Sequence, residues 1–238
     1  MTSELSIALI GTGKMGRALA QLAPERGFRV AAQLGRGDAI NRESLRGAAV
    51  AIEFTSPAAA VANVRACIAA GCPVVVGTTG WTDELPALRA EVERARGALL
   101  TAPNFSLGVA IFSELAAEAA RRFAAAAGFD VHLIEIHHAT KKDAPSGTAK
   151  ALAAAAEAAS GRAVPVTSIR TGSVPGTHEL VFDAPFEQVR FTHEARDRRV
   201  FAEGALVAAR WLAGREPGVY TMHDLVQSGS THGSRERP

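Results

Sequence analysis

The segment Leu5–Gly16, with the sequence LSIALIGTGKMG, decides the fold of this chain. It opens with an apolar run from Leu5 to Ile10 that is typical of a buried strand, and the residues after Gly16 have the composition of a helix. The pattern GxGxxG lies between the two. Its glycines allow a tight turn, the close approach of a pyrophosphate and the close packing of helix on strand. We therefore expect a dinucleotide to be bound at the loop residues Gly11, Thr12, Gly13, Lys14, Met15 and Gly16.

Strand and helix patterns alternate from this segment onward. Ser56 and Pro57 predict the N-cap and the first residue of a helix that Gly71 closes at its C′ position. The alternation is typical of a doubly wound parallel sheet, so we expect an α/β fold of the Rossmann type. The strands are expected at residues 5–10, 28–34, 48–54, 73–76 and 98–102, and a further helix at 83–96.

Four loops of this region follow directly after expected strands. They read GTGKMG, FTSP, GTTG and APNFS, and the second begins at Phe54. Each loop alone fits ordinary turn chemistry, because Gly, Pro, Ser and Asn are the usual turn formers. Ligands of doubly wound sheets bind beyond the carboxyl ends of the strands. Taken together, the four loops therefore predict the rim of a cofactor crevice.

The residues after the second strand bear on the choice of cofactor. Proteins that prefer NAD commonly carry an acidic residue here for the ribose hydroxyls, whereas this chain has Gln33, Leu34, Gly35 and Arg36. Lys14 and Arg36 could hold a 2′-phosphate, which favours NADPH over NADH. The alternative is that Arg36 is a solvated loop charge.

The pattern changes after Phe105. A long helix is expected at 108–127, with Ile111, Leu115, Ala119 and Phe123 as its core-facing stripe. A strand at 131–137, a helix at 148–159, alternating strands at 178–182 and 188–193 and a helix at 203–213 predict a second, α+β domain. Residues 221–226 could return to the first domain, and the polar residues from Gly229 onward are expected to be disordered.

The segment from His137 to Thr148, HHATKKDAPSGT, gathers groups that suit carboxylate binding and proton transfer. The chain has lysine only at positions 14, 141, 142 and 150, so an adjacent pair here is unusual. Ser146 is placed to cap the following helix, and the N–H groups near Gly147 and Thr148 form an anion site beside Lys141 and Lys142. The alternative is a plain cap, solvated lysines and ordinary strand histidines.

A metal site is not expected in this segment. Successive side chains of a strand point to opposite faces, so His137 and His138 cannot easily bind one metal. The chain has neither a CxxC nor an HExxH pattern.

Composition limits the class of protein. The 238 residues, 47% hydrophobic and 21% charged, suffice for one large or two modest domains. A net charge of +2 without a basic run among aromatics argues against nucleic acid, and no apolar run is long enough to span a membrane. The start lacks the pattern of a signal peptide, and Cys67 and Cys72 make no disulfide framework, so we expect a cytoplasmic protein.

The motifs together resemble one enzyme family. HHxxxKDAPSGT is the most specific of them, and GTGKMG, FTSP, GTTGW, APNFSLG, FAEGAL and GVYTMHDL follow the same order along the chain. The chain resembles the 4-hydroxy-tetrahydrodipicolinate reductases, also called dihydrodipicolinate reductases, of diaminopimelate and lysine biosynthesis. The resemblance implies a dinucleotide-binding domain at 1–104 plus 215–238, and a substrate-binding and oligomerisation domain at 105–214 whose mixed sheets form a homotetramer.

The resemblance also implies roles for single residues. His137 would be the proton donor or acceptor and Lys141 the proton donor, while His138, Gly147 and Thr148 would bind a carboxylate of a small dicarboxylate substrate, with Ser146 in the same turn and Lys142 as electrostatic support. The cofactor would be lined further by Gly77, Thr78, Thr79, Ala102, Pro103, Asn104 and Phe105. The phosphate loop is the short GxGxxG form, and the acidic ribose ligand is lacking, so the preference for NADPH or NADH stays open.

On this hypothesis NAD(P)H delivers a hydride to a cyclic unsaturated dicarboxylate while a proton is supplied to the adjacent carbon. A rival is another two-domain oxidoreductase acting on a polyol or semialdehyde. A semialdehyde dehydrogenase that needs a cysteine nucleophile is disfavoured, because neither Cys67 nor Cys72 lies in a ligand loop. A second rival is a sensor that binds NAD(H) without chemistry, for which the Lys and His cluster would have no use.

Overall fold

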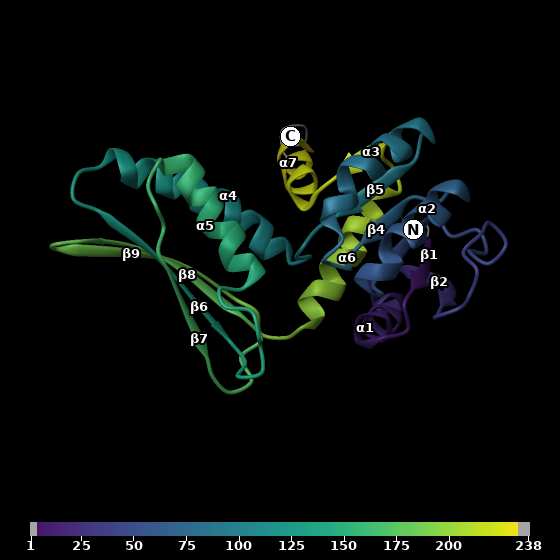
Figure 1. The fold of residues 1–238 in the computed structure, drawn as a ribbon, viewed down its shortest axis with the longest axis horizontal. Helices are drawn as coiled ribbons and strands as arrows, with labels where there is room; N and C mark the ends of the chain where they lie inside the picture. Colours follow the sequence, from purple (N-terminus) through teal and green to yellow (C-terminus); the bar gives the residue numbers. More distant parts are fainter. Residues whose placement is uncertain (1–3, 233–238) are drawn as a thin grey trace, which may run out of the picture. The chain divides into compact units, whose positions relative to one another are not determined.

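The structure, a computed structural model, describes residues 4–232, with side chains as far as residue 228. The chain divides into two compact units (Figure 1). Unit 1 comprises the residues up to Ser106 together with those from Phe201 onward, and unit 2 is Leu107–Val200. Each unit has a sheet and a core of its own.

Unit 1 is built on a six-stranded sheet of order β10-β5-β4-β3-β1-β2, in which every pairing is parallel. Its strands are β1 Leu5–Ile10, β2 Phe28–Leu34, β3 Val50–Glu53, β4 Val74–Val76, β5 Ala98–Thr101 and β10 Gly218–Tyr220. Its helices are α1 Lys14–Leu22, α2 Pro57–Ala69, α3 Leu85–Arg94 and α7 Met222–His232, with α6 Arg199–Leu212 at the junction and short 3₁₀ turns η1 Pro24–Arg26 and η2 Thr82–Glu84. The predicted Rossmann-type sheet is confirmed.

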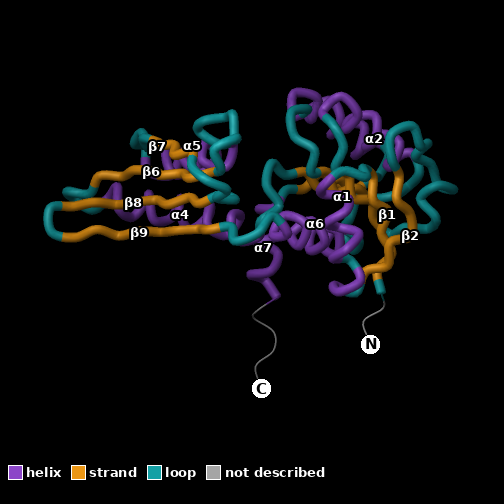
Figure 2. The backbone as a smooth tube through the Cα atoms, turned by 90° about the horizontal axis from the view of Figure 1, so that it is seen from below, coloured by secondary structure: helices purple, strands orange, loops and turns teal. Residues whose placement is uncertain are grey.

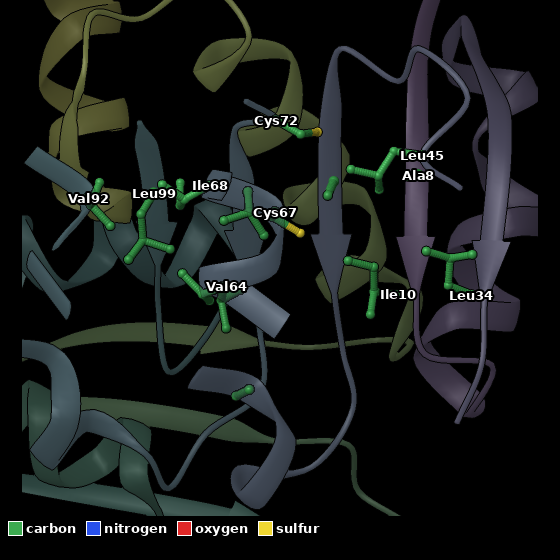
Figure 3. Close-up of a cluster of buried hydrophobic side chains, with 14 of the residues drawn as sticks. Ala8, Ile10, Leu34, Leu45, Val64, Cys67, Ile68, Cys72, Val92 and Leu99 are labelled. Carbon is green, nitrogen blue, oxygen red and sulfur yellow. The ribbon is translucent and has the colours of Figure 1, made fainter. Parts of the chain in front are cut away.

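The core on one face of this sheet is packed by α2 and α3. Val64 and Cys67 of α2 and Val92 of α3 lie against Ala8 and Leu99 of the strands (Figure 3). Both faces of a parallel sheet are covered, which is why its strands read as unbroken apolar runs in the sequence.

The ends of α2 lie where the sequence predicts them. Ser56 is the N-cap in an extended conformation, and Pro57 opens the helix. Gly71, after the C-cap Ala70, has a φ of +73°, the left-handed conformation that glycine adopts without strain.

Unit 2 carries a mixed sheet of order β7-β6-β8-β9 (Figure 2). The pair β6–β7 is parallel, and the pairs β6–β8 and β8–β9 are antiparallel. The strands are β6 Asp130–His137, β7 Val166–Arg170, β8 Thr177–Ala184 and β9 Glu187–Glu194, and the helices are α4 Leu107–Ala125 and α5 Gly147–Ser160. Both helices pack on one face of the sheet around a core that includes Leu133, Leu180 and Phe182.

The predicted core-facing stripe of α4 is wrong for its first half. Ile111 is 42% exposed and Leu115 53%, whereas the buried residues of the helix are Val109, Phe112, Ala116, Ala119 and Ala120. The helix itself is rich in alanine, so the periodicity of apolar residues cannot by itself identify the buried face. The small residues face α5 because they allow the two helices to approach closely.

The end of the chain returns to unit 1 earlier than expected. β10 pairs in parallel with β5, so the return itself is confirmed, but residues 222–226 already belong to α7. The expectation of disorder from Gly229 is wrong as far as residue 232, because α7 continues to there. Residues 233–238 lie outside the described residues. Between residues 4 and 232, no helix is both long and apolar enough to cross a membrane.

Candidate active site

The phosphate loop of unit 1 has the geometry that its glycines predict. A Cβ on Gly11, whose φ is +109°, would lie 2.0 Å from the carbonyl oxygen of Phe54, and one on Gly16 would lie 1.8 Å from that of Gly11. A Cβ on Gly13 would meet nothing within 4 Å. The outer two glycines are therefore required for packing, and the middle one leaves open space at the start of α1.

The N-terminus of α1 suits a phosphate. Gly13 is its N-cap and offers no side-chain acceptor, and the first turn holds no acidic residue. The first N–H groups of a helix need acceptors, and the partial positive charge there favours an anion. Lys14 follows at the first helical position, so the loop fits the pyrophosphate of a dinucleotide.

Three more of the predicted cofactor loops meet in unit 1. The ring of Phe54 lies so close to Gly77 that a Cβ there would be 2.0 Å from its Cε1. The same ring packs edge to face with Phe105, with 5.9 Å between centroids. Thr78 Oγ1 accepts a hydrogen bond of 2.7 Å from the N–H of Thr55, and these contacts join the ends of β3, β4 and β5.

The remaining residues of these loops lie beside this cluster. Asn104 Oδ1 accepts a hydrogen bond of 2.8 Å from the N–H of Ser106, which holds the turn after β5. Ala102 is buried, and Thr79 and Pro103 are exposed. In the phosphate loop, Thr12 and Lys14 are exposed and Met15 is half-buried.

The end of β2 carries an acidic side chain that the sequence analysis missed. Asp38 Oδ2 accepts a hydrogen bond of 2.7 Å from the N–H of Gly35. A Cβ at Gly35 would lie 3.6 Å from Thr12 and 3.7 Å from this oxygen, so the carboxylate lies near the phosphate loop. Arg36 is exposed beside it. Asp38 is four residues beyond Leu34, the end of β2, and the turn places its carboxylate next to Gly35 and close to the phosphate loop.

The segment after β6 in unit 2 separates the two histidines. His137 is buried, with 7% of its surface exposed, on the face of the sheet that α4 and α5 cover. His138 is half-buried, and its Nδ1 shares a hydrogen bond of 2.8 Å with Thr140 Oγ1. The two rings therefore have different surroundings, as the alternation of a strand predicts.

A buried carboxylate, Glu135, holds the ring of His137. Glu135 is fully buried, and its Oε2 is hydrogen-bonded to Nδ1 of His137. The Arg170 guanidinium binds both of its oxygens, Nη2 to Oε1 at 2.6 Å and Nη1 to Oε2 at 3.0 Å. Burial acts to raise the pKa of Glu135, but hydrogen bonds from Arg170, Ser168 and His137 lower it to about 2.

The two buried histidines stay neutral near pH 7. Burial lowers the pKa of His137 and outweighs the opposing hydrogen bond and charge of Glu135. Burial, with His137 beside it, lowers the pKa of His178 to about 4. The two rings meet edge to face, with centroids 5.2 Å apart.

Lys141 lies close enough to His137 for its positive charge to act on that ring. Its Nζ donates to Asp143 Oδ1 at 2.7 Å, and its side chain is 22% exposed. The Lys141 ammonium lowers the pKa of the Asp143 carboxyl, and the N–H of Gly147 acts in the same direction. Arg170 Nη2 also donates to the carbonyl oxygen of Asp143 at 2.6 Å, so the loop is tied to the end of β7. Lys142 is exposed.

Ser146 caps α5 and faces inward. Its Oγ accepts a hydrogen bond of 3.1 Å from the N–H of Ala149 and shares one of 3.3 Å with Nε2 of His178. Its own N–H donates to Glu135 Oε1 at 3.2 Å. Ser146 is therefore a helix cap, which the sequence analysis gave as the alternative to a substrate-binding role. Gly147 and Thr148 are the residues of the turn that reach the surface.

Both halves of the chain match one family. Residues 5–105 match the model described as dihydrodipicolinate reductase, N-terminus, and residues 108–226 match that described as dihydrodipicolinate reductase, C-terminus. The chain belongs to the dihydrodipicolinate reductase family.

Curated relatives agree with this membership, and a solved structure agrees with the fold. A 4-hydroxy-tetrahydrodipicolinate reductase of Acidiphilium cryptum (strain JF-5) is 40% identical over 250 residues, which cover 94% of this chain and 98% of the relative. A 4-hydroxy-tetrahydrodipicolinate reductase of Christiangramia forsetii is 34% identical over 93% of this chain and 98% of the relative. The dipicolinate-bound dihydrodipicolinate reductase from Paenisporosarcina sp. TG-14 has the same fold, with a TM-score of 0.81 at 23% identity over 93% of this chain and 99% of that one.

The site of this family member contains residues that sequence reasoning did not single out. Glu135 and Arg170 hold His137, and His178 lies beside it. The available signal was Glu135 itself, a carboxylate between Ile134 and Ile136 in the strand DVHLIEIH. Within residues 4–232, no group of three or more His, Cys, Asp or Glu side chains is arranged to hold a metal.

Proposed function

We propose that this protein reduces 4-hydroxy-tetrahydrodipicolinate to tetrahydrodipicolinate with NAD(P)H, as the names of its relatives indicate. The observation that carries the proposal is the group of His137, Lys141 and the α5 N-terminus at the carboxyl end of β6, in a chain that also has a dinucleotide loop. Unit 1 is the dinucleotide-binding domain, and unit 2 is the substrate-binding and oligomerisation domain.

The proposed chemistry divides between the cofactor and the end of β6. The nicotinamide would supply the hydride when it is bound, and the 4-hydroxyl group of the substrate leaves as water, so that one hydride and one proton are taken up for each water released. Lys141 supplies the proton to the adjacent carbon, and a positioned acid of this kind contributes about 10² to 10⁴-fold in rate. His138 and the N–H groups of Gly147 and Thr148 bind a substrate carboxylate. A carboxylate arriving there competes with Asp143 for Lys141, which would turn the ammonium toward the substrate.

The proposal includes NADPH as the preferred reductant and NADH as a second one. Lys14 and Arg36 favour a 2′-phosphate because both are positively charged. Asp38 acts in the opposite sense, since its carboxylate repels a phosphate and can bind ribose hydroxyls. A cytoplasmic location suits Cys67 and Cys72, which are free and buried thiols.

A homotetramer formed through the unit 2 sheets completes the proposal. Ile134 and Ile136 of β6 lie on the face opposite α4 and α5, and Ile169, the register partner of Ile136 on β7, is 41% exposed. Apolar side chains at neighbouring sheet positions are typical of a surface that another subunit covers.

The deciding experiment follows nicotinamide absorbance. Enzyme, freshly generated substrate and either NADPH or NADH are mixed, and the loss of absorbance is recorded. The Lys141→Ala variant should lose about 10²-fold or more of kcat while its Kd for NADPH stays unchanged. Lys150→Ala is the matched control, because Lys150 is an exposed lysine of α5 outside the proposed site. Full activity of Lys141→Ala would refute the proton-donor role, and no absorbance loss with either cofactor would favour the sensor.

A further inference from the structure

The carboxylate of Glu135 accepts hydrogen bonds from five donors. Arg170 supplies two, at 2.6 and 3.0 Å, the N–H of Ser146 a third at 3.2 Å, and His137 Nδ1 and the Ser168 side chain two more. Ionised carboxylates have about four lone-pair sites, so this one is saturated. A saturated carboxylate held by a bidentate arginine has a single orientation.

The sheet register puts these groups in place. Glu135 on β6 is opposite Ser168 on β7 and His178 on β8, and His137 is opposite Arg170. Residues two apart on a strand share a face, so Glu135, His137, Ser168 and Arg170 point to the same side. Backbone pairing of three strands therefore sets most of this geometry, and the N–H of Ser146, at the end of the loop that carries Lys141, adds to it.

The contact with Glu135 decides where the proton of His137 lies. An ionised carboxylate only accepts hydrogen bonds, so Nδ1 of the neutral ring carries the hydrogen and Nε2 carries the lone pair. The opposite edge of the ring abuts Gly176, where a Cβ would lie 2.9 Å from Nε2. His178 packs against the ring edge to face. The ring is thus held on three sides.

We infer that Glu135, clamped by Arg170, is a positioning residue that fixes His137 with its proton on Nδ1 and its lone pair on Nε2. This inference rests on the proposed function for its kinetic consequence: His137 accepts a hydrogen bond or a proton from the bound substrate, and Lys141 is the group that donates. The family resemblance left His137 as either a proton donor or a proton acceptor, and this inference makes it the acceptor.

The first test measures the tautomer directly. Two-bond ¹⁵N–¹H correlation spectra of the ring-labelled protein, with His137 assigned through a His137→Gln variant, report the type of each ring nitrogen. The charged and titratable neighbours of His137 are Glu135, Arg170, His178 and Lys141, so spectra are taken from pH 6 to 9. We expect Nδ1 to be of the N–H type and Nε2 of the lone-pair type. A hydrogen on Nε2 of the neutral ring would overturn the inference.

The second test separates positioning from folding. Glu135→Gln removes the charge and offers Nδ1 an amide that can donate as well as accept, so the tautomer is no longer fixed. We expect kcat to fall about 10- to 100-fold, as for other supporting residues, with the KM for substrate and the Kd for NADPH changed less than about threefold. Glu157→Gln is the matched control in the same unit, because Glu157 accepts only a backbone N–H, that of Val164 at 2.9 Å.

A conservative variant tests whether a lower kcat reflects the position of His137 or a misfolded protein. Glu135→Asp keeps the charge but withdraws the carboxylate by one methylene, so it should retain the Nδ1–H tautomer with an intermediate kcat. If Glu135→Gln or Glu135→Asp is folded by circular dichroism and keeps full kcat, the inference is wrong. Failure of the proposed function would instead appear as absence of turnover in the wild type, with the tautomer still measurable.

Discussion

At the scale of single residues, Gly176 limits the position of His137. Its φ is +151°, and a Cβ would lie 2.9 Å from Nε2. Gly172 precedes it in the same loop, also with positive φ (+50°), but a Cβ there would meet nothing within 4 Å. The two glycines therefore differ in whether a Cβ would touch the ring of His137.

We predict that Gly176→Ala lowers kcat about 10²-fold, because displacement of a reacting group by about 1 Å has an effect of this size. Gly172→Ala also places an L side chain at a positive φ in the same loop but does not touch His137, and it should keep most of its activity. Steady-state kinetics and thermal unfolding of both variants check this. Equal kcat values for the two would show that the contact with Nε2 is unimportant.

Among single residues, sequence reasoning succeeded where a motif sets the spacing and failed where no motif does. The roles of Gly11 and Gly16 follow from the GxGxxG spacing, and both glycines are required for packing. Asp38 was missed because only the turn after β2 brings its carboxylate back to Gly35. Glu135 was missed because its partner Arg170 is 35 residues away in sequence.

At the scale of elements, the start of α5 depends on Ser146. Its Oγ accepts the N–H of Ala149, whereas Ser56, in the same N-cap position of α2, makes no side-chain hydrogen bond to its helix. The two serines were predicted by the same rule, and only one of them caps with its side chain.

We predict that Ser146→Ala lowers the free energy of unfolding by about 1 kcal/mol, the usual contribution of an N-cap. Ser56→Ala should change it by much less. Chemical denaturation of each variant, followed by circular dichroism, measures the difference. An equal loss for both serines would contradict the assignment of the cap.

The buried histidines of the unit 2 sheet predict how stability depends on pH. The unfolded ring of His178 takes up a proton near pH 6.5, but burial lowers its folded pKa to about 4. Protonation therefore favours the unfolded state as the pH falls from about 6.5 to about 4, and the contribution of neutral His178 to stability is fully present above about 6.5. The lowered pKa values of His137 and His193 act in the same direction.

We predict that the midpoint of thermal unfolding falls between pH 6.5 and pH 4, and that His178→Gln makes this fall shallower. Scanning calorimetry of the wild type and of His178→Gln at several pH values measures the difference. A slope unaffected by His178→Gln would mean that this ring is not buried in its neutral form.

At the scale of the whole molecule, the second domain is an insertion into the first. The chain leaves unit 1 at Ser106 and re-enters it at Phe201, and β10 adds a strand beside β5 at the edge of the unit 1 sheet. A discontinuous domain of this kind leaves no linker in the sequence. The family resemblance implied it, and composition did not.

The proposed tetramer makes its own prediction. Ile169→Glu places a charge among the apolar side chains on the helix-free face of the unit 2 sheet, where burial without a partner is unfavourable. We expect this variant to elute as a smaller species in size-exclusion chromatography with light scattering. Ala154→Glu, on the exposed side of α5, is the control for adding a charge to the same unit away from that face. A wild-type protein that is monomeric at micromolar concentration would contradict the tetramer.

The sequence by itself determined the parallel sheet of unit 1, its glycine loop and the segment from His137 to Thr148, because each is set by neighbours a few residues apart. Only the tertiary structure decided which face of α4 is buried and which groups surround His137. The alanine-rich helix has no single apolar face of its own, and the packing of α5 selects one. Glu135, Arg170 and His178 come from three strands, and their meeting depends on the register of backbone hydrogen bonds, which no local pattern of residues records.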